Sequence, residues 1–475
     1  SFGNPAKFSR IARRISRHKP IVALKSGRSS GGARAAASHT GALATSDAFV
    51  DALFHQSGVI RTDTVTELFD AAMMLSRQPL PGGRRIAVVT NAGGPGILAV
   101  DACQSHGLTI AELTDDTKRA LRAFLPSAAS INNPIDMLAA APAEHYERTL
   151  HAVLADPNVD SVLVIFIPPL VTSADDVANA IHRAVEGSPK KPIAGVFMRT
   201  DAAPSALANI PCFAFPEPAA IAMARIAAYA EWRHRAPGVV PSLSDVQPTL
   251  ARLVVERALG RGDGWLTAIE ANALMTSVGI AVPRSTLATS IDEAVDTSHR
   301  LGYPVALKAV GRELLHKTEQ KAVRLNLQTR GEVRMAASEL TRALGTRMEG
   351  LLAQRMVTGG AEMMIGAIND ATFGHVIVCG SGGVLVDLLA DSACRLHPVT
   401  DQDAVEMVES LKGVRLLRGY RGSAPADEEA FREAILRVSA LIGICPEIQE
   451  LDVNPLAVLP GGVSALDVRI RVARA

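Results

Sequence analysis

Residues 36–44 place a histidine among the small residues that a phosphate-binding turn uses, in the order Ala-Ala-Ser-His-Thr-Gly-Ala-Leu-Ala. They follow a strand-like run and open an apparent helix. The start of a helix offers unpaired N–H groups and a partial positive charge, which favour bound phosphate. Because neutral imidazole is also a competent nucleophile, the pattern predicts that His39 accepts and passes on a phosphoryl group, beside Ser38, Thr40 and Gly41. The alternative is a histidine that only caps the helix.

A second candidate phosphate site is the glycine-rich turn at residues 91–96, Asn-Ala-Gly-Gly-Pro-Gly, which follows a buried apolar run. Glycines let backbone N–H groups converge on an oxyanion, and the helix that follows adds its dipole. We expect phosphate to contact Asn91, Gly93, Gly94 and Gly96. The turn is no Walker loop, since Gly-Lys-Ser/Thr does not follow. A tight connection without a ligand is the alternative.

The last part of the chain has the residues that a nucleotide site needs. Lys308 ends an apolar strand, where a lysine can reach a phosphate as a fixed cation. His316 lies in a polar loop, where it is either a mobile acceptor or an inert surface residue. A strand edge between two lobes could present groups to an adenine, and we expect it to include Gln354, Met356 and Glu362.

A further glycine-rich turn, residues 379–383, precedes three charged residues spaced by four. These are Asp387, Asp391 and Arg395. The spacing fits a helix face or a strand edge that carries charges to a site. We include Arg395 among the predicted ATP contacts.

Acidic and amide side chains alternate with apolar ones at residues 450–455, which puts Glu450, Asp452 and Asn454 on one face of a strand. Asp467 lies on the strand predicted to pair with it. Hard oxygen ligands held on adjacent strands suit Mg²⁺ bridged to ATP phosphates. An ordinary polar hairpin is the alternative.

The composition excludes several classes of protein. With 475 residues, of which 48% are hydrophobic and 4% aromatic, the chain can bury about three domain cores. A net charge of +1 gives no overall field for nucleic acid or an anionic membrane. No apolar run approaches the ~18 residues of a membrane span. The five scattered cysteines fit reduced thiols in a cytoplasmic protein.

The order of strands and helices predicts three domains. Residues 1–80 contain two strands, too few for a stable sheet, so we expect this segment to complete its sheet with missing residues or with the next domain. Residues 83–235 alternate strand and helix, which indicates a parallel, doubly wound sheet. Residues 236–248 are a proline-punctuated linker, and residues 249–475 read as a two-lobed α+β nucleotide-binding domain.

On these motifs the chain resembles the NDP-forming acyl-CoA synthetases, relatives of succinyl-CoA synthetase, over nearly its whole length. The resemblance implies an α/β fold: two flavodoxin-like parallel-sheet domains, the first a phosphohistidine subdomain, followed by an ATP-grasp domain. It also implies an acid–thiol ligase that converts a small carboxylic acid, CoA and ATP to acyl-CoA, ADP and phosphate. His39 would be the central phosphohistidine and His316 a shuttle, while Asn454 and Asp467 match the positions of Mg²⁺ ligands. A homo-oligomer is compatible with the resemblance.

Two departures from the family pattern stand out. We find no N-terminal CoA-binding domain, and the glutamate that normally supports the phosphohistidine falls upstream of Ser1. The chain start therefore predicts that upstream residues were removed or lie on another polypeptide. Where paired glycines usually follow the second histidine, Lys321 and Ala322 stand instead.

Two other functions are compatible with these motifs. One is a regulatory module of a protein acetyltransferase-type system that senses nucleotide or acyl-CoA, for which the nucleophile His39 would be superfluous. The other is an ATP-grasp ligase that joins a carboxylate to an amine, which would need no phosphohistidine.

Overall fold

The computed structural model describes residues 4–25, 47–169, 172–186, 188–198, 204–311, 322–383, 391–420, 422 and 424–474. The chain divides into two compact units, Ser1–Ala236 and Pro237–Ala475. Within the described residues, none of the helices is both long enough and apolar enough to cross a membrane.

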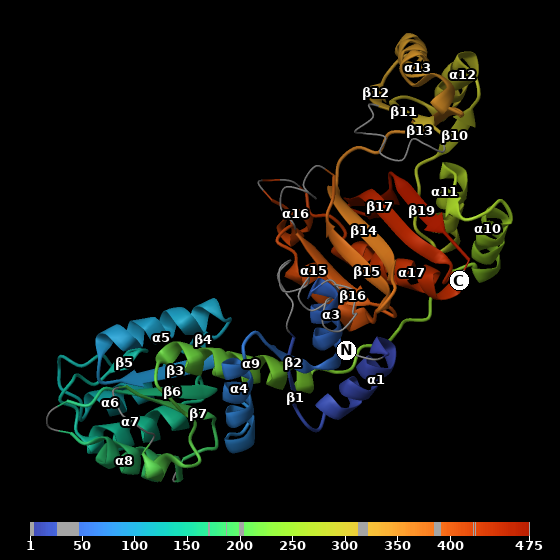
Figure 1. The fold of residues 1–475 in the computed structure, drawn as a ribbon. Helices are drawn as coiled ribbons and strands as arrows, with labels where there is room; N and C mark the ends of the chain where they lie inside the picture. Colours follow the sequence, from blue (N-terminus) through green and yellow to red (C-terminus); the bar gives the residue numbers. More distant parts are fainter. Residues whose placement is uncertain are drawn as a thin grey trace. The chain divides into compact units, whose positions relative to one another are not determined.

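The first unit is built on a parallel sheet (Figure 1). Its elements, in chain order, are α1 (Pro5–Ser16), β1 (Ile21–Leu24), α3 (Asp47–Ser57), β2 (Val59–Thr62), α4 (Val65–Arg77), β3 (Arg85–Thr90), α5 (Gly93–Ser105), β4 (Thr109–Ile110), α6 (Asp115–Arg122), β5 (Ile135–Asp136), α7 (Ala143–Ala155), β6 (Ser161–Phe166), α8 (Ala174–Glu186), β7 (Ile193–Phe197), β8 (Cys212–Phe213) and α9 (Pro216–His234).

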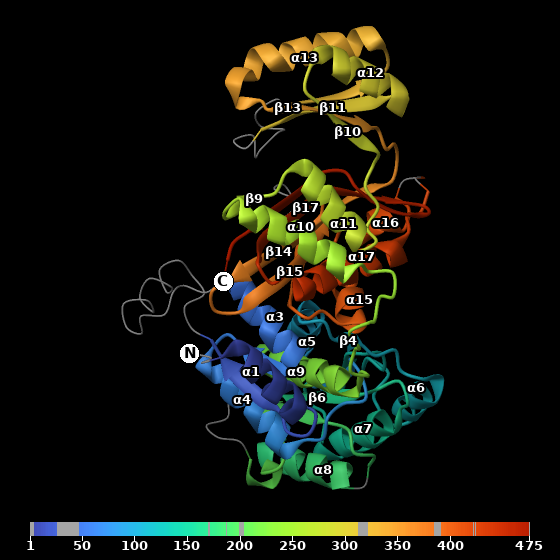
Figure 2. The same cartoon turned by 90° about the vertical axis from the view of Figure 1, so that its right-hand side faces the viewer.

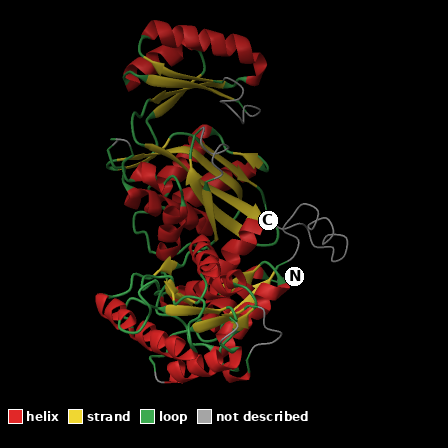
Figure 3. Ribbon diagram, turned by 90° about the vertical axis from the view of Figure 1, so that its left-hand side faces the viewer, coloured by secondary structure: helices red, strands yellow, loops and turns green. Residues whose placement is uncertain are grey.

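The sheet has the order β4-β3-β6-β7-β8, with β5 also on β3, and every pairing in it is parallel. Its strands are apolar throughout because both faces are covered. One face packs on α5 and α9, and the other packs on α7 and α8 (Figure 1). Figure 3 shows helices on both sides of this sheet. The predicted doubly wound sheet is confirmed. The strand order reverses between β3 and β6, where such folds bind ligands beyond the carboxyl ends of the strands.

Among the described residues, β1 and β2 form a two-stranded parallel sheet that does not join the larger one. Of the two ways in which we expected this sheet to be completed, pairing with the next domain is not seen among the described residues. The segment is stabilised instead through helices: α4 packs on α9, and Met74 of α4 is fully buried in the core that α9 shares with the larger sheet.

The second unit contains two antiparallel sheets. Its elements are α10 (Pro248–Gly260), β9 (Gly264–Trp265), α11 (Ala268–Ser277), β10 (Ser285–Ala288), α12 (Ile291–Leu301), β11 (Val305–Val310), β12 (Val323–Leu327), α13 (Arg330–Leu344), β13 (Gly350–Arg355), β14 (Ala361–Asp370), β15 (Gly374–Ser381), β16 (Ser392–Leu396), α15 (Asp401–Ser410), α16 (Val414–Leu417), α17 (Glu428–Ile444), β17 (Ile448–Leu459), β18 (Gly462–Ala465) and β19 (Val468–Val472).

The small sheet has the order β10-β13-β11-β12, and α12 and α13 cover one of its faces (Figure 2). The large sheet has the order β16-β15-β14-β17-β19-β9, with β18 also on β17. One face of the large sheet packs on α10, α11, α15 and α17. Leu451 and Val453 of β17 belong to this core. Because neighbouring residues of a strand point to opposite faces, Asp452 and Asn454 lie on the other face, as predicted.

Two details of the prediction are wrong. The glycine-rich turn at 91–96 is shorter than expected, because α5 already begins at Gly93. The strand that was predicted to carry Asp467 and to pair with residues 450–455 is interrupted: β18 ends at Ala465, β19 begins at Val468, and Asp467 lies on the bend between them.

Candidate functional site

A lysine and a glutamine of the small sheet meet the large sheet at one carbonyl group. The Lys308 ammonium of β11 donates to the Leu466 carbonyl oxygen at 2.6 Å, and the Gln354 amide of β13 donates to the same oxygen at 3.2 Å. The pairing of Lys308 with Leu352 and of Ala306 with Gln354 puts both side chains on one face of the small sheet. This contact joins the two sheets at the bend between β18 and β19.

Asp467, on the same bend, forms an ion pair with Lys308 across a distance of 3.4 Å. The pairing register of β17 with β18 continues into its pairing with β19, so Asp467 stands opposite Asn454. The backbone N–H of Asn454 donates to the Asp467 carbonyl at 3.1 Å. The interruption of the strand thus turns the Asp467 side chain to Lys308 while it stays beside Asn454.

The glycine turn that follows β15, Ser381–Gly383, reaches the same place. The Gly383 N–H donates to the side-chain oxygen of Asn454 at 2.9 Å, and the Gly382 N–H donates to the Glu362 carbonyl at 2.9 Å. Gly383 has φ +62°, and a Cβ there would collide with the Glu362 carboxylate. Glu362, Asn454 and this turn are therefore close neighbours, which the sequence did not indicate.

Gln354 has an acceptor that the described residues leave unsatisfied. The residue is 5% exposed, and its side-chain oxygen has no hydrogen-bond partner there. The orientation of the amide is fixed, because the Leu466 carbonyl can only accept and so must face the NH₂ group. A buried acceptor without a donor costs free energy, so this oxygen is suited to a ligand that brings an N–H group.

The oxygen donors of this cluster fit Mg²⁺ in the form that accompanies ATP. Among the described residues, no three His, Cys, Asp or Glu side chains are grouped so as to hold a metal alone. Mg²⁺ commonly takes one or two protein oxygens and completes its coordination with water and substrate phosphates. The Asp467 carboxylate and the Asn454 amide oxygen, which lie opposite each other, supply such a pair.

Two predicted nucleotide contacts have other partners. The Met356 N–H donates to the Pro304 carbonyl at 3.0 Å and so extends the pairing of the small sheet. Arg395 lies on β16, three strands from β17 in the sheet order. Its guanidinium is buried beside Asp403 and Glu406, at 3.6 and 3.4 Å. The structure therefore does not bring Arg395 to the Lys308 cluster.

In the first unit, the turn after β3 lies where the strand order reverses. Asn91 is buried, and its amide exchanges two hydrogen bonds of 2.9 Å with the backbone of Ile167, beyond the end of β6. The side chain that we expected on phosphate thus joins the ends of β3 and β6. A Cβ at Gly96 would lie 3.0 Å from the Thr90 side chain, so this glycine serves close packing of α5 on β3.

Gly93 and Gly94 form the exposed first turn of α5, which has no side-chain cap. Their N–H groups belong to the helix start, where anions bind. Asp136 is the last residue of β5, the strand that pairs with β3, and its carboxylate lies beside Gly93: a Cβ on Gly93 would be 3.2 Å from Asp136 Oδ2. A phosphate at this helix start would therefore approach a carboxylate as well as the helix dipole.

The two candidate phosphate-carrying histidines cannot be placed. His39, with Ser38, Thr40 and Gly41, falls in 26–46, and His316 falls in 312–321; both segments lie outside the described residues. Their roles stay predictions from sequence.

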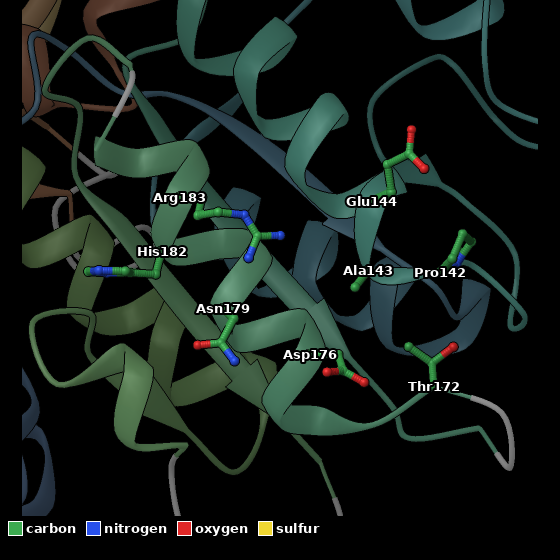
Figure 4. A pocket seen from close by; sticks show the side chains of 8 residues that line it. All are labelled: Pro142, Ala143, Glu144, Thr172, Asp176, Asn179, His182 and Arg183. Atoms are coloured by element: carbon green, nitrogen blue, oxygen red, sulfur yellow. The ribbon is translucent and has the colours of Figure 1, made fainter.

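An open pocket of about 560 Å³ lies over α7 and α8 (Figure 4). Its polar lining comes from Thr172, Glu144 and the α8 residues Asp176, Asn179 and His182, and it includes Arg183, which pairs with Glu147. None of the residues singled out from the sequence lines it. We assign it no role.

The chain was compared with protein families and with known proteins. Residues 1–75 match the succinyl-CoA ligase like flavodoxin domain, residues 86–237 the Ligase-CoA domain, and residues 257–472 the ATP-grasp domain. Half of the chain also resembles a solved structure of acetyl-coenzyme A synthetase 1 from Ca. Korarchaeum cryptofilum with phosphate and ADP. That match has 34% identity, a TM-score of 0.47, and covers 49% of this chain and 52% of the other.

Two relatives match 98% of the chain. The ADP-forming acetate–CoA ligase I of Archaeoglobus fulgidus is 36% identical over 473 residues, and the ADP-forming 4-hydroxybutyrate–CoA ligase of Nitrosopumilus maritimus is 34% identical over 481. The matches cover 68% and 69% of those proteins. The chain belongs to the family of ADP-forming acid–CoA ligases, and it is an enzyme of that class. The family and the α/β fold with an ATP-grasp domain were both predicted from the sequence.

Proposed function

We propose that the chain uses ATP to activate a small carboxylic acid for transfer to CoA, with a phosphohistidine as intermediate. The observation that supports this most directly is the cluster in which Lys308, Asp467 and Asn454 meet between the two sheets of the ATP-grasp domain. It offers a cation for phosphate and two oxygens for Mg²⁺ in one place. The substrates named for the relatives include acetate and 4-hydroxybutyrate, and another relative of 32% identity is a trans-feruloyl-CoA synthase, so these names select no particular acid.

The described residues divide the work of binding ATP. Lys308 would exchange its contact with Asp467 for a phosphate oxygen. Asp467 and Asn454 would then hold Mg²⁺, which when bound offsets the negative charge of the phosphates. The unsatisfied Gln354 oxygen would accept a hydrogen bond from the exocyclic amine of adenine. Guanine has a carbonyl oxygen at the corresponding position, so Gln354 favours ATP over GTP.

The chemistry would proceed in three transfers. A ring nitrogen of His39 attacks the terminal phosphorus of ATP, and ADP leaves. A carboxylate oxygen of the acid then takes the phosphoryl group from His39, which gives an acyl phosphate. Finally the CoA sulfur attacks the acyl carbon, phosphate leaves, and the thiol proton passes to solvent. The Gly93 and Gly94 N–H groups would bind the phosphoryl group in the first unit. A shuttle role for His316 would add one transfer: His316 would take the phosphoryl group from ATP, and His39 would take it from His316.

The test is phosphorylation of the purified chain by Mg-ATP, assayed as label that is stable in base and labile in acid. We compare the wild-type chain with His39→Ala and His316→Ala. Loss of label in His39→Ala, alone or together with His316→Ala, is the expected result.

An unlabelled wild-type chain that still binds ATP would contradict the phosphohistidine relay for this chain. It would favour the sensor instead. ADP release that needs an amine, without a labelled intermediate, would indicate the amine ligase.

A further inference from the structure

A buried aspartate joins three separate segments next to the glycine turn Ser381–Gly383. Asp391 is 8% exposed. One of its carboxylate oxygens accepts from the Lys412 N–H at 2.8 Å, and the other accepts from the Gly413 N–H at 2.7 Å and from the Ser381 hydroxyl at 2.8 Å. Its backbone carbonyl also accepts from the Ser381 N–H at 3.1 Å.

These bonds leave the aspartate no freedom to move without moving the turn. Gly413 has to be a glycine, because a Cβ there would collide with the Ser381 hydroxyl. A Cβ at Gly382 would likewise collide with the Met363 carbonyl of β14. The turn is thus fixed on one side by Asp391 and on the other by β14.

The fixed turn places one N–H group at the nucleotide cluster. Two residues after Ser381, the Gly383 N–H donates to the side-chain oxygen of Asn454. This bond orients the amide of Asn454, the residue that stands opposite Asp467. Outer partners of a metal ligand commonly determine its orientation and affect metal affinity.

We propose that Asp391 is a positioning residue for the Mg²⁺–nucleotide site: through Ser381 it holds the glycine turn whose Gly383 N–H orients Asn454. Asp391 touches neither nucleotide nor metal. The proposal rests on the proposed function, because it takes Asn454 as a ligand of Mg²⁺.

The charge state of Asp391 agrees with this role. Burial alone would raise the pKa of its carboxyl, but the hydrogen bonds from Lys412, Gly413 and Ser381 outweigh burial and lower the pKa. The residue therefore stays ionised, and an ionised carboxylate can accept all three bonds at once.

The test is the Mg²⁺ dependence of nucleotide binding by the whole 475-residue chain, measured by calorimetry with ADP over a range of Mg²⁺ concentrations. In Asp391→Asn an NH₂ group replaces one of the two acceptors. We expect Mg²⁺ to bind about tenfold more weakly in the presence of ADP, with binding of Mg²⁺-free ADP unchanged. Ser381→Ala removes one of the three hydrogen bonds to the Asp391 carboxylate and should weaken Mg²⁺ binding less. This variant keeps the test available if Asp391→Asn does not fold.

The matched control is Asp403→Asn. Asp403 is 6% exposed, belongs to the capping box of α15 through the N–H and hydroxyl of Thr400, and pairs with Arg395; among the described residues, these hydrogen bonds and this ion pair do not involve the glycine turn. This variant should lower stability and leave the Mg²⁺ dependence at the wild-type value. An equal shift in Asp403→Asn would show a general effect of destabilisation and overturn the proposal.

Asn454→Ala distinguishes the positioning role of Asp391 from the metal-ligand role of Asn454. If it weakens Mg²⁺ binding while Asp391→Asn and Ser381→Ala behave as wild type, the positioning role is wrong and the metal assignment stands. If Asn454→Ala leaves the Mg²⁺ dependence of ADP binding as it is in the wild-type chain, Asn454 is not a ligand of Mg²⁺. The positioning role of Asp391 then fails as well.

Discussion

The two candidate phosphate sites of this chain are built in opposite ways. In the second unit, charged and amide side chains converge from two sheets, with Lys308 at 3.4 Å from Asp467. In the first unit, the exposed helix start at Gly93 and Gly94 offers backbone N–H groups, while the nearby Asn91 side chain is bound to Ile167. Substitution of side chains can therefore remove the site in the second unit. In the first unit it can only reshape the site, because the backbone N–H groups remain.

The largest effect is expected at Lys308. Lys308→Met removes the cation that faces the phosphates, and we expect Mg-ATP affinity to fall about a hundredfold, since a charge-assisted contact of about 2–3 kcal/mol is lost. Equilibrium binding measures it. Lys412→Met is the control, because the Lys412 side chain is exposed; besides its backbone N–H bond to Asp391 it contributes only an attraction to the charge of that carboxylate. A loss below about threefold would contradict the assignment of Lys308.

A smaller effect should appear at Gln354. Gln354→Met keeps the side-chain length but removes both the acceptor for adenine and the donor to Leu466. We expect ATP affinity to fall about tenfold, as one hydrogen bond of about 1 kcal/mol or more is lost, while GTP affinity stays low. Competition between the two nucleotides gives the ratio directly. If the wild-type chain already binds GTP as tightly as ATP, Gln354 does not select the base.

The smallest effect distinguishes the glycines of the helix start in the first unit. A Cβ at Gly94 meets nothing within 4 Å, whereas one at Gly96 meets Thr90 at 3.0 Å. Gly94→Ala should therefore raise the free energy of unfolding by about 0.5 kcal/mol, through better helix propensity. Gly96→Ala should lower it by about 1 kcal/mol through crowding.

Fluorescence can restrict that measurement to one unit. The chain has two tryptophans, Trp232 in the first unit and Trp265 in the second. In a Trp265→Phe background, denaturant titration followed by Trp232 emission reports the first unit alone. A lower free energy of unfolding in Gly94→Ala would contradict this prediction, because it would show that position 94 needs glycine although a Cβ there has open space.

Sequence reasoning succeeded where a strand's alternation fixes geometry. The spacing of Asp452 and Asn454 placed both on the face of β17 away from the helices, and the apolar run of β3 predicted a strand covered on both faces. A period of two residues is a local property, so it can be read from a few letters.

It was less successful where a side chain's partner is a backbone group far away in the sequence. Asn91 looked like a phosphate ligand, but its partner is the backbone of Ile167, and no spacing rule indicates that pairing. The Leu466 carbonyl carries no side-chain signal at all. Arg395 was predicted to contact ATP, and the structure gives it two carboxylate partners, Asp403 and Glu406; a buried arginine in an ion-pair cluster and one aimed at a phosphate cannot be distinguished in a sequence.

The shared carbonyl of Leu466 has a consequence for the energetics of binding. In the chain without nucleotide, Lys308 and Asp467 act as each other's counter-ions, and Lys308 and Gln354 both hold the same acceptor. A nucleotide that takes the lysine must break the pair, and this leaves less positive charge beside Asp467, where Arg469 stays at 3.8 Å. The lysine's attraction to phosphate and the aspartate's attraction to Mg²⁺ are therefore thermodynamically coupled, so each should strengthen the other by the same factor.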